Sequence, residues 1–378
     1  MVVDIRVCLS KSNYIRFFLN EFEILQLPNS LLRTPYSELP TQKSGLNSQN
    51  SILNTQKSEL TRNSELRTQN SELKILIVCS KNSGRIAPFI TDQVEALQEA
   101  GVNCEYFTVE GKGITGYLLN LLPLWRKITA YQPDIIHAHY GLSGVLANLQ
   151  RKVPVVTTYH GSDINNAKVR RFSKIAIRLS AWNIFVSQKN IQLSGVKKRF
   201  SLIPCGVDTS VFKPMDKAVC RQKFGFDPDE KLILFAGAFD NKVKNPELAI
   251  AAVAKIPDAR LLELKGYNRA QVAELMNAVD VCLMTSYTEG SPQFVKEALA
   301  CNCPVVSVNV GDVEELLQGV EHCRIVEREV DKIAKSVSEL LNLNQRSPGS
   351  EKIRYSGYES LYVVDKIKNL YQNIIENA

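Results

Sequence analysis

Two glutamates, Glu289 and Glu297, flank a turn and the start of a helix in the second half of the chain. Between them, Gly290 permits a sharp bend, Ser291 is a favourable N-cap, and Pro292 suits the first helical position. Carboxylates repel phosphate but accept hydrogen bonds from hydroxyls. The pattern therefore indicates a turn whose acidic side chains suit the hydroxyls of a sugar.

The helix that follows this turn suits an anion. Phe294 and Val295 fall in its first turn, where backbone N–H groups lack partners and the helix dipole is positive. The apolar run 281–284 precedes the turn and predicts a buried parallel strand. Ligands of open α/β sheets bind beyond the carboxyl ends of the strands, so the sequence predicts a phosphate site here.

Histidines mark the ends of two other predicted strands. His137 and His139 close the stretch 134–139, and His160 follows the apolar run 153–159. A zinc site is one interpretation, because His137 and His139 point to the same side of a strand and His160 could add a third ligand.

These motifs resemble the retaining nucleotide-sugar glycosyltransferases of family 4, which have the two-domain GT-B fold. Residues 289–298 match the pattern E-G-x-P-x-x-x-x-E-A, residues 134–139 match D-x-x-H-x-H, and residues 160–161 give the H-G pair. Residues 203–208 resemble I-P-N-G-V-D with Cys205 in place of Asn, and residues 310–314 resemble G-G-x-x-E. The resemblance covers Lys74 to about Gln372.

The resemblance implies transfer of a sugar from a nucleoside diphosphate sugar to an acceptor hydroxyl, with retained configuration and without a metal or a cofactor. It assigns His160, Glu289 and Lys244 as catalytic. The implied donor contacts are Gly84, Gly237, Lys242, Gly266, Tyr267, Gly290, Ser291, Pro292, Phe294, Val295 and Glu297. The implied acceptor-side residues are His139, Asp163, Arg170 and Arg171, while His137 is assigned a structural role.

One departure from the family pattern concerns the diphosphate. The family has an arginine after the glycine at position 237, where this chain has Ala238. Lys244, with Lys242 as the second choice, then matches the family's lysine. The lost cation keeps a non-catalytic nucleotide-sugar-binding protein open as an alternative, and an epimerase of the same fold is another. Asp227-Pro228-Asp229 fits a metal-binding D-x-D pattern, but its polar, proline-containing surroundings indicate a turn.

Composition separates residues 1–73 from the rest. From Pro40 to Leu73 a seven-residue unit rich in Ser, Asn and Gln recurs. Each unit offers one apolar residue where a coiled-coil seam needs two, so we expect a disordered, low-complexity extension. Translation of upstream repeat DNA, with natural synthesis starting later, is a further hypothesis.

The remaining chain is predicted to be α/β, with two Rossmann-like, doubly wound domains across a cleft. We expect an acceptor-side domain at 74–212 and a nucleotide-sugar-binding domain at 213–355. By resemblance, a C-terminal helix within 356–378 packs back on the first domain. The composition, 44% hydrophobic and 22% charged, is that of a globular protein.

Charge is unevenly distributed along the chain. Residues 74–215 contain 18 Lys and Arg against 8 Asp and Glu, whereas residues 216–378 contain 20 against 24. The basic half favours an anionic partner, namely the donor diphosphate, an acidic or lipid-linked glycan acceptor, or an anionic membrane. No nucleic-acid motif accompanies the charge, so we expect no nucleic-acid partner.

Two segments bear on a membrane. Residues 117–128 are apolar with a basic end and predict either a core helix kinked at Pro123 or a helix lying on a membrane surface. The basic helix 168–178 is either a solvated face or an electrostatic contact. No transmembrane run or secretory signal is present, and the nine cysteines lack metal-site spacing. We expect a cytoplasmic protein with reduced cysteines, with peripheral contact at the inner membrane face as an open alternative.

Overall fold

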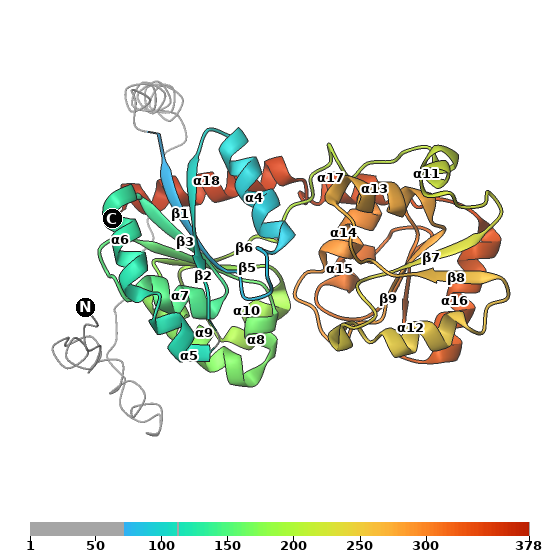
Figure 1. The fold of residues 1–378 in the computed structure, drawn as a ribbon, viewed down its shortest axis with the longest axis horizontal. Helices are drawn as coiled ribbons and strands as arrows, with labels where there is room; N and C mark the ends of the chain where they lie inside the picture. Colours follow the sequence, from blue (N-terminus) through green and yellow to red (C-terminus); the bar gives the residue numbers. More distant parts are fainter. Residues whose placement is uncertain (1–71, 112, 378) are drawn as a thin grey trace, which may run out of the picture. The chain divides into compact units, whose positions relative to one another are not determined.

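The computed structural model describes residues 72–111 and 113–377 (Figure 1). The predicted low-complexity extension lies outside the described residues except for its last two positions, 72 and 73. The described chain contains two parallel sheets in sequence order. This arrangement confirms the predicted α/β fold with two Rossmann-like sheets.

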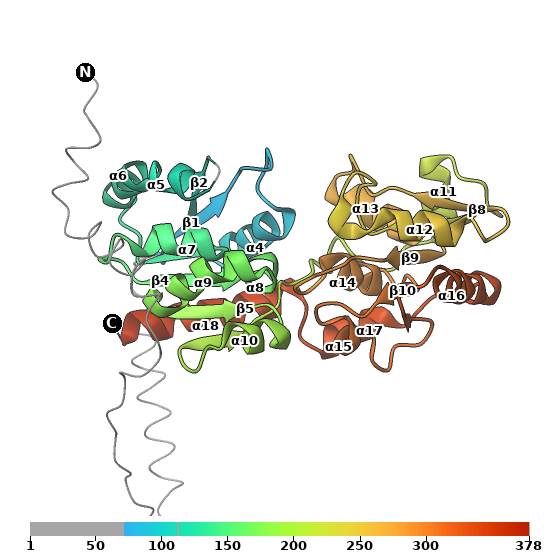
Figure 2. The same cartoon turned by 90° about the horizontal axis from the view of Figure 1, so that it is seen from below.

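The first sheet has the strand order β2-β1-β3-β4-β5-β6, and all its neighbours are parallel. Its central strands are continuous apolar runs because helices cover both faces. Ile75 and Ile77 pack with side chains of α4 and α18, whereas Leu76 and Val78 pack with side chains of α6 and α7. Figure 2 shows these helices around the first sheet. The strands are β1 (Lys74–Ser80), β2 (Asn103–Val109), β3 (Ile135–His139), β4 (Val155–Tyr159), β5 (Trp182–Phe185) and β6 (Phe200–Leu202).

The second sheet has the order β11-β10-β9-β7-β8 and is also parallel. One face packs on α13 and α14, and the other packs on α12 and α16. The predicted domain limits stay predictions. The strands are β7 (Lys231–Phe235), β8 (Ala259–Leu262), β9 (Val281–Met284), β10 (Val305–Val308) and β11 (Arg324–Val326).

Helices connect the strands in both halves. In the first half they are α4 (Pro88–Glu99), α5 (Gly113–Leu118), α6 (Leu121–Tyr131), α7 (Gly141–Asn148), α8 (Ser162–Asn165), α9 (Ala167–Leu179) and α10 (Gln188–Ser194). In the second half they are α11 (Lys217–Phe224), the 3₁₀ helix η1 (Lys242–Lys244), α12 (Pro246–Val253), α13 (Arg269–Ala278), α14 (Gln293–Ala300), α15 (Val313–Leu317), α16 (Val330–Leu343), α17 (Gly349–Tyr355) and α18 (Ser360–Glu376).

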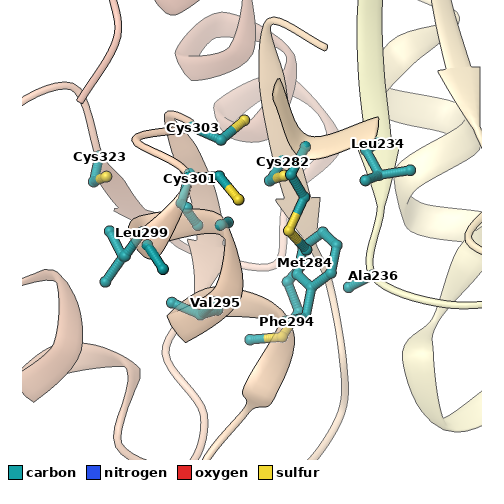
Figure 3. Close-up of a cluster of buried hydrophobic side chains, with 14 of the residues drawn as sticks. Leu234, Ala236, Cys282, Met284, Phe294, Val295, Leu299, Cys301, Cys303 and Cys323 are labelled. Carbon is teal, nitrogen blue, oxygen red and sulfur yellow. The ribbon is translucent and has the colours of Figure 1, made fainter. Parts of the chain in front are cut away.

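The cysteines of the second sheet are core residues. Cys282, Cys301 and Cys303 are fully buried among aliphatic side chains (Figure 3). They are free thiols, as are the other cysteines that the structure describes. Their burial as thiols agrees with the reduced cysteines that the sequence led us to expect.

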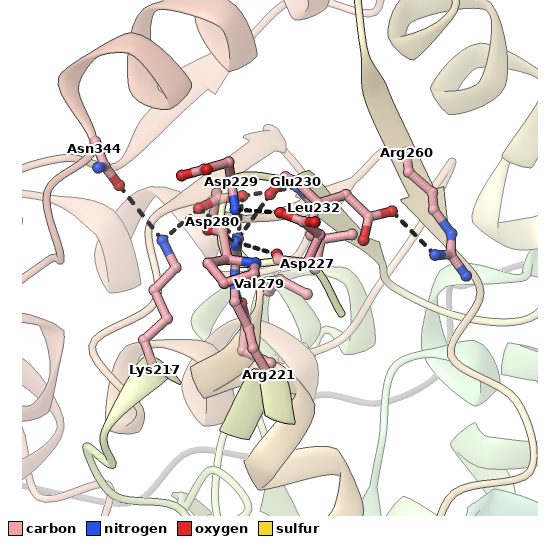
Figure 4. Close-up of polar contacts among 12 residues, drawn as sticks. Lys217, Arg221, Asp227, Asp229, Glu230, Leu232, Arg260, Val279, Asp280 and Asn344 are labelled. Carbon is pink, nitrogen blue, oxygen red and sulfur yellow. Dashed lines mark hydrogen bonds and ion pairs between the residues drawn. The ribbon is translucent and has the colours of Figure 1, made fainter. Parts of the chain in front are cut away.

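A buried ion-pair network fixes the start of β9. Arg221, which is 4% exposed, binds Asp280 and donates to carbonyls of the 227–230 turn (Figure 4). Asp280 also accepts from the backbone N–H of Leu232 at 2.7 Å and pairs with Lys217. The 227–229 segment is therefore a turn held by arginine, which confirms the turn predicted from its polar, proline-containing surroundings.

The apolar segment 117–128 differs from the predicted core helix. It forms two helices, α5 and α6, which separate around Asn120 because its side chain bonds the carbonyls of Glu110 and Gly116. Pro123 lies in the first turn of α6, where its missing N–H has no helical partner, so the predicted kink is wrong. Only Leu124 in this segment is buried, while neighbouring apolar side chains are exposed. No helix in the described part of the chain is long and apolar enough to cross a membrane.

The last helix returns to the first sheet. Side chains of α18 join the core of β1, β3 and α4. His137 of β3 is fully buried, with one ring nitrogen at the Tyr371 hydroxyl of α18 and the other 2.7 Å from the Thr158 hydroxyl. Both nitrogens are thus engaged, which agrees with the structural role assigned to His137.

We predict that His137→Gln destabilises the protein by about 2 kcal/mol at pH 7, because it disrupts these buried hydrogen bonds. Burial lowers the pKa of His137 to about 3. The unfolded chain binds a proton below about pH 6.5, so the wild type alone loses about 2 kcal/mol through this group between pH 7 and pH 5. Urea unfolding at both pH values should show the gap closing, and a constant gap would contradict the assignment.

Candidate functional site

A cavity of about 310 Å³ lies among loops that follow strands of both sheets. Tyr140, His160 and Cys205 follow β3, β4 and β6, and Lys244 and Glu289 follow β7 and β9. Parallel strands bring all these loops to the carboxyl edges of their sheets. The other lining residues are Phe89, Ser162, Asn165, Val186, Val243, Thr288, Gly290, Ser291, Pro292, Gln293 and Phe294.

Two glycine turns touch backbone to backbone beside this cavity. A Cβ atom on Gly290 would lie 2.1 Å from the carbonyl oxygen of His160, and one on Gly161 would lie 2.4 Å from Cα of Gly290. Gly161 also has a φ of +108°, which disfavours other residues. Asn165 reinforces the contact by donating to the Glu289 carbonyl at 2.9 Å. The contact brings His160 and Glu289 to one cavity.

His160 sits in an aromatic and histidine-rich environment. Its ring centroid is 4.7 Å from those of Phe89 and Tyr140. Nε2 lies 3.0 Å from Nδ1 of His139, and Nδ1 lies 3.6 Å from the sulfur of Cys205. Burial, then the nearby positive groups, lowers the pKa of His160 to about 3. The imidazole is therefore neutral near pH 7.

Lys244 and Glu289 face one another in the cavity. Lys244 Nζ lies 2.7 Å from Glu289 Oε1, and both side chains are mostly buried. Lys244 ends η1, which follows Gly237, and its Cγ would lie 3.0 Å from a Cβ on that glycine. The two residues predicted as catalytic in the second domain thus form one ion pair.

The start of α14 differs slightly from the prediction. The helix begins at Gln293 with Pro292 as its N-cap, so Ser291 is not the cap, and its side chain makes no capping bond. Gly290, Ser291, Pro292 and Phe294 line the cavity as expected. Val295 is fully buried in the core, so only its backbone N–H can serve an anion.

Glu297 requires a correction. Its carboxylate is buried, and Oε1 lies 2.8 Å from Arg269, outside the cavity. The same Arg269 nitrogen lies 2.6 Å from Asp92 of α4. The expected donor contact of Glu297 is therefore replaced here by an arginine shared between two carboxylates.

Two acceptor-side assignments are also corrected. His139 is fully buried behind His160, so it cannot face an acceptor. Asp163 is 3% exposed, and its carboxylate accepts from the backbone N–H groups of Gly141, His160 and Gly161. Its burial raises its pKa to about 6. Both residues position the His160 turn.

The remaining assigned residues lie outside the cavity. Gly84 and Gly266 have positive φ and open space around them, which fits turns. Tyr267 packs against the ring of Phe224, and Lys242 is exposed. Arg170 and Arg171 lie on α9, away from the cavity lining.

Several lining residues escaped the sequence argument. Asn165 and Thr288 carry no motif of their own, although Asn165 follows the H-G-S-D stretch closely, and Cys205 was noted only as a departure from I-P-N-G-V-D. Phe89 and Tyr140 resemble ordinary core aromatics in sequence. Lys296, a lysine between the apolar residues Val295 and Ala298 of α14, was an unused signal.

The described residues contain no group of three or more His, Cys, Asp or Glu arranged to hold a metal ion. The zinc interpretation needed His137 and His139 as ligands. Both ring nitrogens of His137 already form hydrogen bonds, and Nδ1 of His139 forms a hydrogen bond with His160. The cluster is therefore explained by internal hydrogen bonding.

Comparison with known proteins gives matches in both halves. The family model described as Glycosyltransferase Family 4 matches residues 89–211, and the one described as Glycosyl transferases group 1 matches residues 259–343. The D-inositol 3-phosphate glycosyltransferase of Mycobacterium marinum is 26% identical over 279 residues, which cover 60% of each chain. TuaC of Bacillus subtilis, named for teichuronic acid biosynthesis, is 27% identical over 238 residues, covering 54% of this chain and 61% of TuaC. The chain thus spans about 60% of the length of these relatives.

Solved structures share the fold. Sucrose-phosphate synthase of Thermosynechococcus elongatus aligns with a TM-score of 0.71 at 18% identity, over 81% of this chain and all of that chain. Anabaena HepE in complex with UDP-glucose aligns with a TM-score of 0.64 at 17% identity, over 80% and 100%. At these identities the likeness concerns the fold alone.

We predict that Gly290→Ala costs more than about 2 kcal/mol, because the added methyl forces two backbones apart. Gly266→Ala is the matched control. It has a strained φ of +84° but open space, so it should cost about 1 kcal/mol. Urea unfolding measures both, and a Gly290 variant no less stable than the control would refute the backbone contact.

Proposed function

Because the chain belongs to the glycosyltransferases of family 4 and group 1 and has the GT-B fold, we propose that it transfers a sugar from a nucleoside diphosphate sugar to an acceptor hydroxyl. The observation that carries this proposal is the cavity that unites Lys244 and Glu289 with His160 and the start of α14. A cation, a carboxylate and free N–H groups are what a diphosphate and a sugar need.

The chemical task is to stabilise the departing diphosphate. Its negative charge grows as the bond to the sugar breaks, and fixed donors in a water-poor site stabilise that charge best. We assign this role to Lys244 and to the N–H groups at the start of α14. The diphosphate would compete with Glu289 for the ammonium of Lys244, since the Glu289 carboxylate lies 2.7 Å from Lys244 Nζ.

Glu289 then gains a second role. When a diphosphate takes the ammonium of Lys244, the carboxylate becomes free to accept hydrogen bonds from hydroxyls of the transferred sugar. Neutral His160 contributes polar contact to the same region without adding charge. Retention of configuration by attack on the face of the leaving group is part of the proposal, and it rests on family membership.

We predict that UDP, ADP, GDP or one of their sugars raises the melting temperature of the wild type. UDP is the first probe, because Anabaena HepE was solved with UDP-glucose. Lys244→Met should weaken nucleoside diphosphate binding by about 30-fold, which corresponds to about 2 kcal/mol. Lys242→Met, two residues away and exposed, is the charge-matched control and should bind normally.

Two outcomes would oppose this function. If none of these nucleotides raises the melting temperature, the proposal of a nucleoside diphosphate donor is refuted. If both lysine variants bind the nucleotide equally well, Lys244 does not contact the diphosphate. Glu289→Gln separates catalysis from binding, since it should bind the nucleotide at least as tightly as the wild type while turnover drops at least 100-fold. Release of the nucleoside diphosphate without any acceptor would favour the epimerase alternative.

We also infer that the protein works at an anionic membrane surface, on a sugar or lipid-linked glycan acceptor in surface polysaccharide or glycolipid synthesis. Four large apolar side chains of the α5–α6 region, Leu118, Leu119, Leu122 and Trp125, are 41–66% exposed. The basic helix α9 presents Lys168, Arg171, Lys174 and Arg178 to solvent. Helix α7 contacts both α5 and α9, so the apolar and basic regions are near neighbours.

We predict that the wild type floats with vesicles containing phosphatidylglycerol in a flotation assay, whereas it floats only weakly with pure phosphatidylcholine vesicles. Replacing Leu119 and Leu122 by serine should weaken vesicle binding at least tenfold, because the apolar surface of two leucines is no longer buried in the bilayer interface. Leu361→Ser, at a residue 70% exposed elsewhere, is the control. Equal partitioning of all three proteins would exclude this surface.

A further inference from the structure

Lys296 lies within α14 and is fully buried. Its neighbours Val295, Ala298 and Leu299 belong to the hydrophobic core, so the ammonium is surrounded by a medium that solvates charge poorly. Lysine is among the residues that are least often fully buried, because removing its charge from water costs several kcal/mol. Its presence at this position therefore needs a reason.

The direct contacts of Lys296 are with neutral groups. Nζ donates to the carbonyl oxygen of Cys205 at 2.6 Å and lies 5.8 Å from the ring centroid of Tyr358. No carboxylate in the described part of the chain forms an ion pair with it. Burial lowers its pKa, while the more distant Asp312 and Glu297 act in the opposite direction.

The ammonium sits directly behind the cavity wall. Cys205, whose carbonyl it binds, lines the cavity, and so do Gln293 and Phe294 one turn earlier on α14. Its charge is felt at the cavity, since Lys296 contributes to the lowered pKa of His160. In a region of low effective dielectric constant, a unit charge acts over several ångströms without direct contact.

Other cations near the cavity are less able to supply charge. Lys244 shares its charge with Glu289, and Arg269 is held between Asp92 and Glu297. Arg328 is exposed and donates to the carbonyls of Ser286 and Tyr287. The chain also has Ala238 at the position where its resemblance to family 4 implies an arginine.

We propose that Lys296 is a positioning residue of the donor site, which holds the Cys205 loop against α14 and supplies from behind the wall the positive charge absent at Ala238. This inference rests on the proposed function, since it requires a diphosphate in the cavity. The ammonium does not touch the donor. It acts through its field and through the Cys205 carbonyl.

The experiment compares UDP with uridine, which shares the base and ribose but lacks the diphosphate. Lys296→Met removes the charge and the hydrogen bond, whereas Lys296→Gln keeps an N–H donor and removes only the charge. We expect both variants to bind UDP at least tenfold more weakly, with uridine affinity changed less than twofold. Calorimetry measures UDP binding, and ligand-observed NMR measures uridine binding.

A purely structural role predicts another result. Lys296→Gln would then bind UDP normally, or both ligands would weaken together, and either result overturns the proposal. Wild-type protein that binds neither UDP nor another nucleoside diphosphate would instead refute the proposed function. The two failures are therefore distinguishable.

A second variant keeps the test valid if both Lys296 variants fail to fold. Asp312 is buried, is electrostatically coupled to Lys296, and has its pKa raised to about 6 by burial. Asp312→Asn removes a negative charge that opposes Lys296, so UDP should bind severalfold more tightly at pH 7.5, with uridine unaffected. Unchanged or weaker UDP binding by this variant would overturn the role of the Lys296 charge.

Discussion

The site depends on a direct contact between backbone segments of different loops, with no side chain between them. Gly161, Gly290 and Gly311 come from three different loops, and a Cβ on any one would lie 2.6 Å or less from the backbone of another residue in this group of turns. Such close approach is available only to glycine. Because His160 and Glu289 immediately precede two of these glycines, the contact that excludes side chains at 161 and 290 also fixes where the imidazole and the carboxylate lie.

The topology explains why these three loops can meet. Both sheets are wholly parallel, so the segments after β4, β9 and β10 all emerge at carboxyl edges. Helix α18 adds a second covalent connection between the two halves, because it follows the second half of the chain and packs into the core of β1 and β3. Hydrogen bonds such as Gln293 to the Gly206 carbonyl at 2.8 Å add to the glycine contact.

Local features of the sequence were predictable, and distant partnerships were not. Apolar runs such as 75–79 and 281–284 became buried strands because continuous hydrophobicity is what a doubly covered parallel strand requires. The Glu289 turn was recognisable for the same local reason. The capture of Glu297 by Arg269, the burial of His139 behind His160 and the separation of α5 from α6 depend on partners elsewhere in the fold. Neither spacing nor composition contains that information.

Two of the cations in and near this site already pair with carboxylates, so a phosphate would have to compete for them. Lys244 must leave Glu289 before it can serve a phosphate, so its net gain is smaller than its charge suggests. Arg269 would have to break ion pairs with two carboxylates before it could bind a phosphate. It therefore serves to link α4 to α14. Lys296 differs from both, because its hydrogen-bond partner is the neutral carbonyl of Cys205 and no carboxylate among the described residues forms an ion pair with it. Under the proposal, Lys296 adds to the wall of the donor cavity a positive charge that it does not share with a directly paired carboxylate.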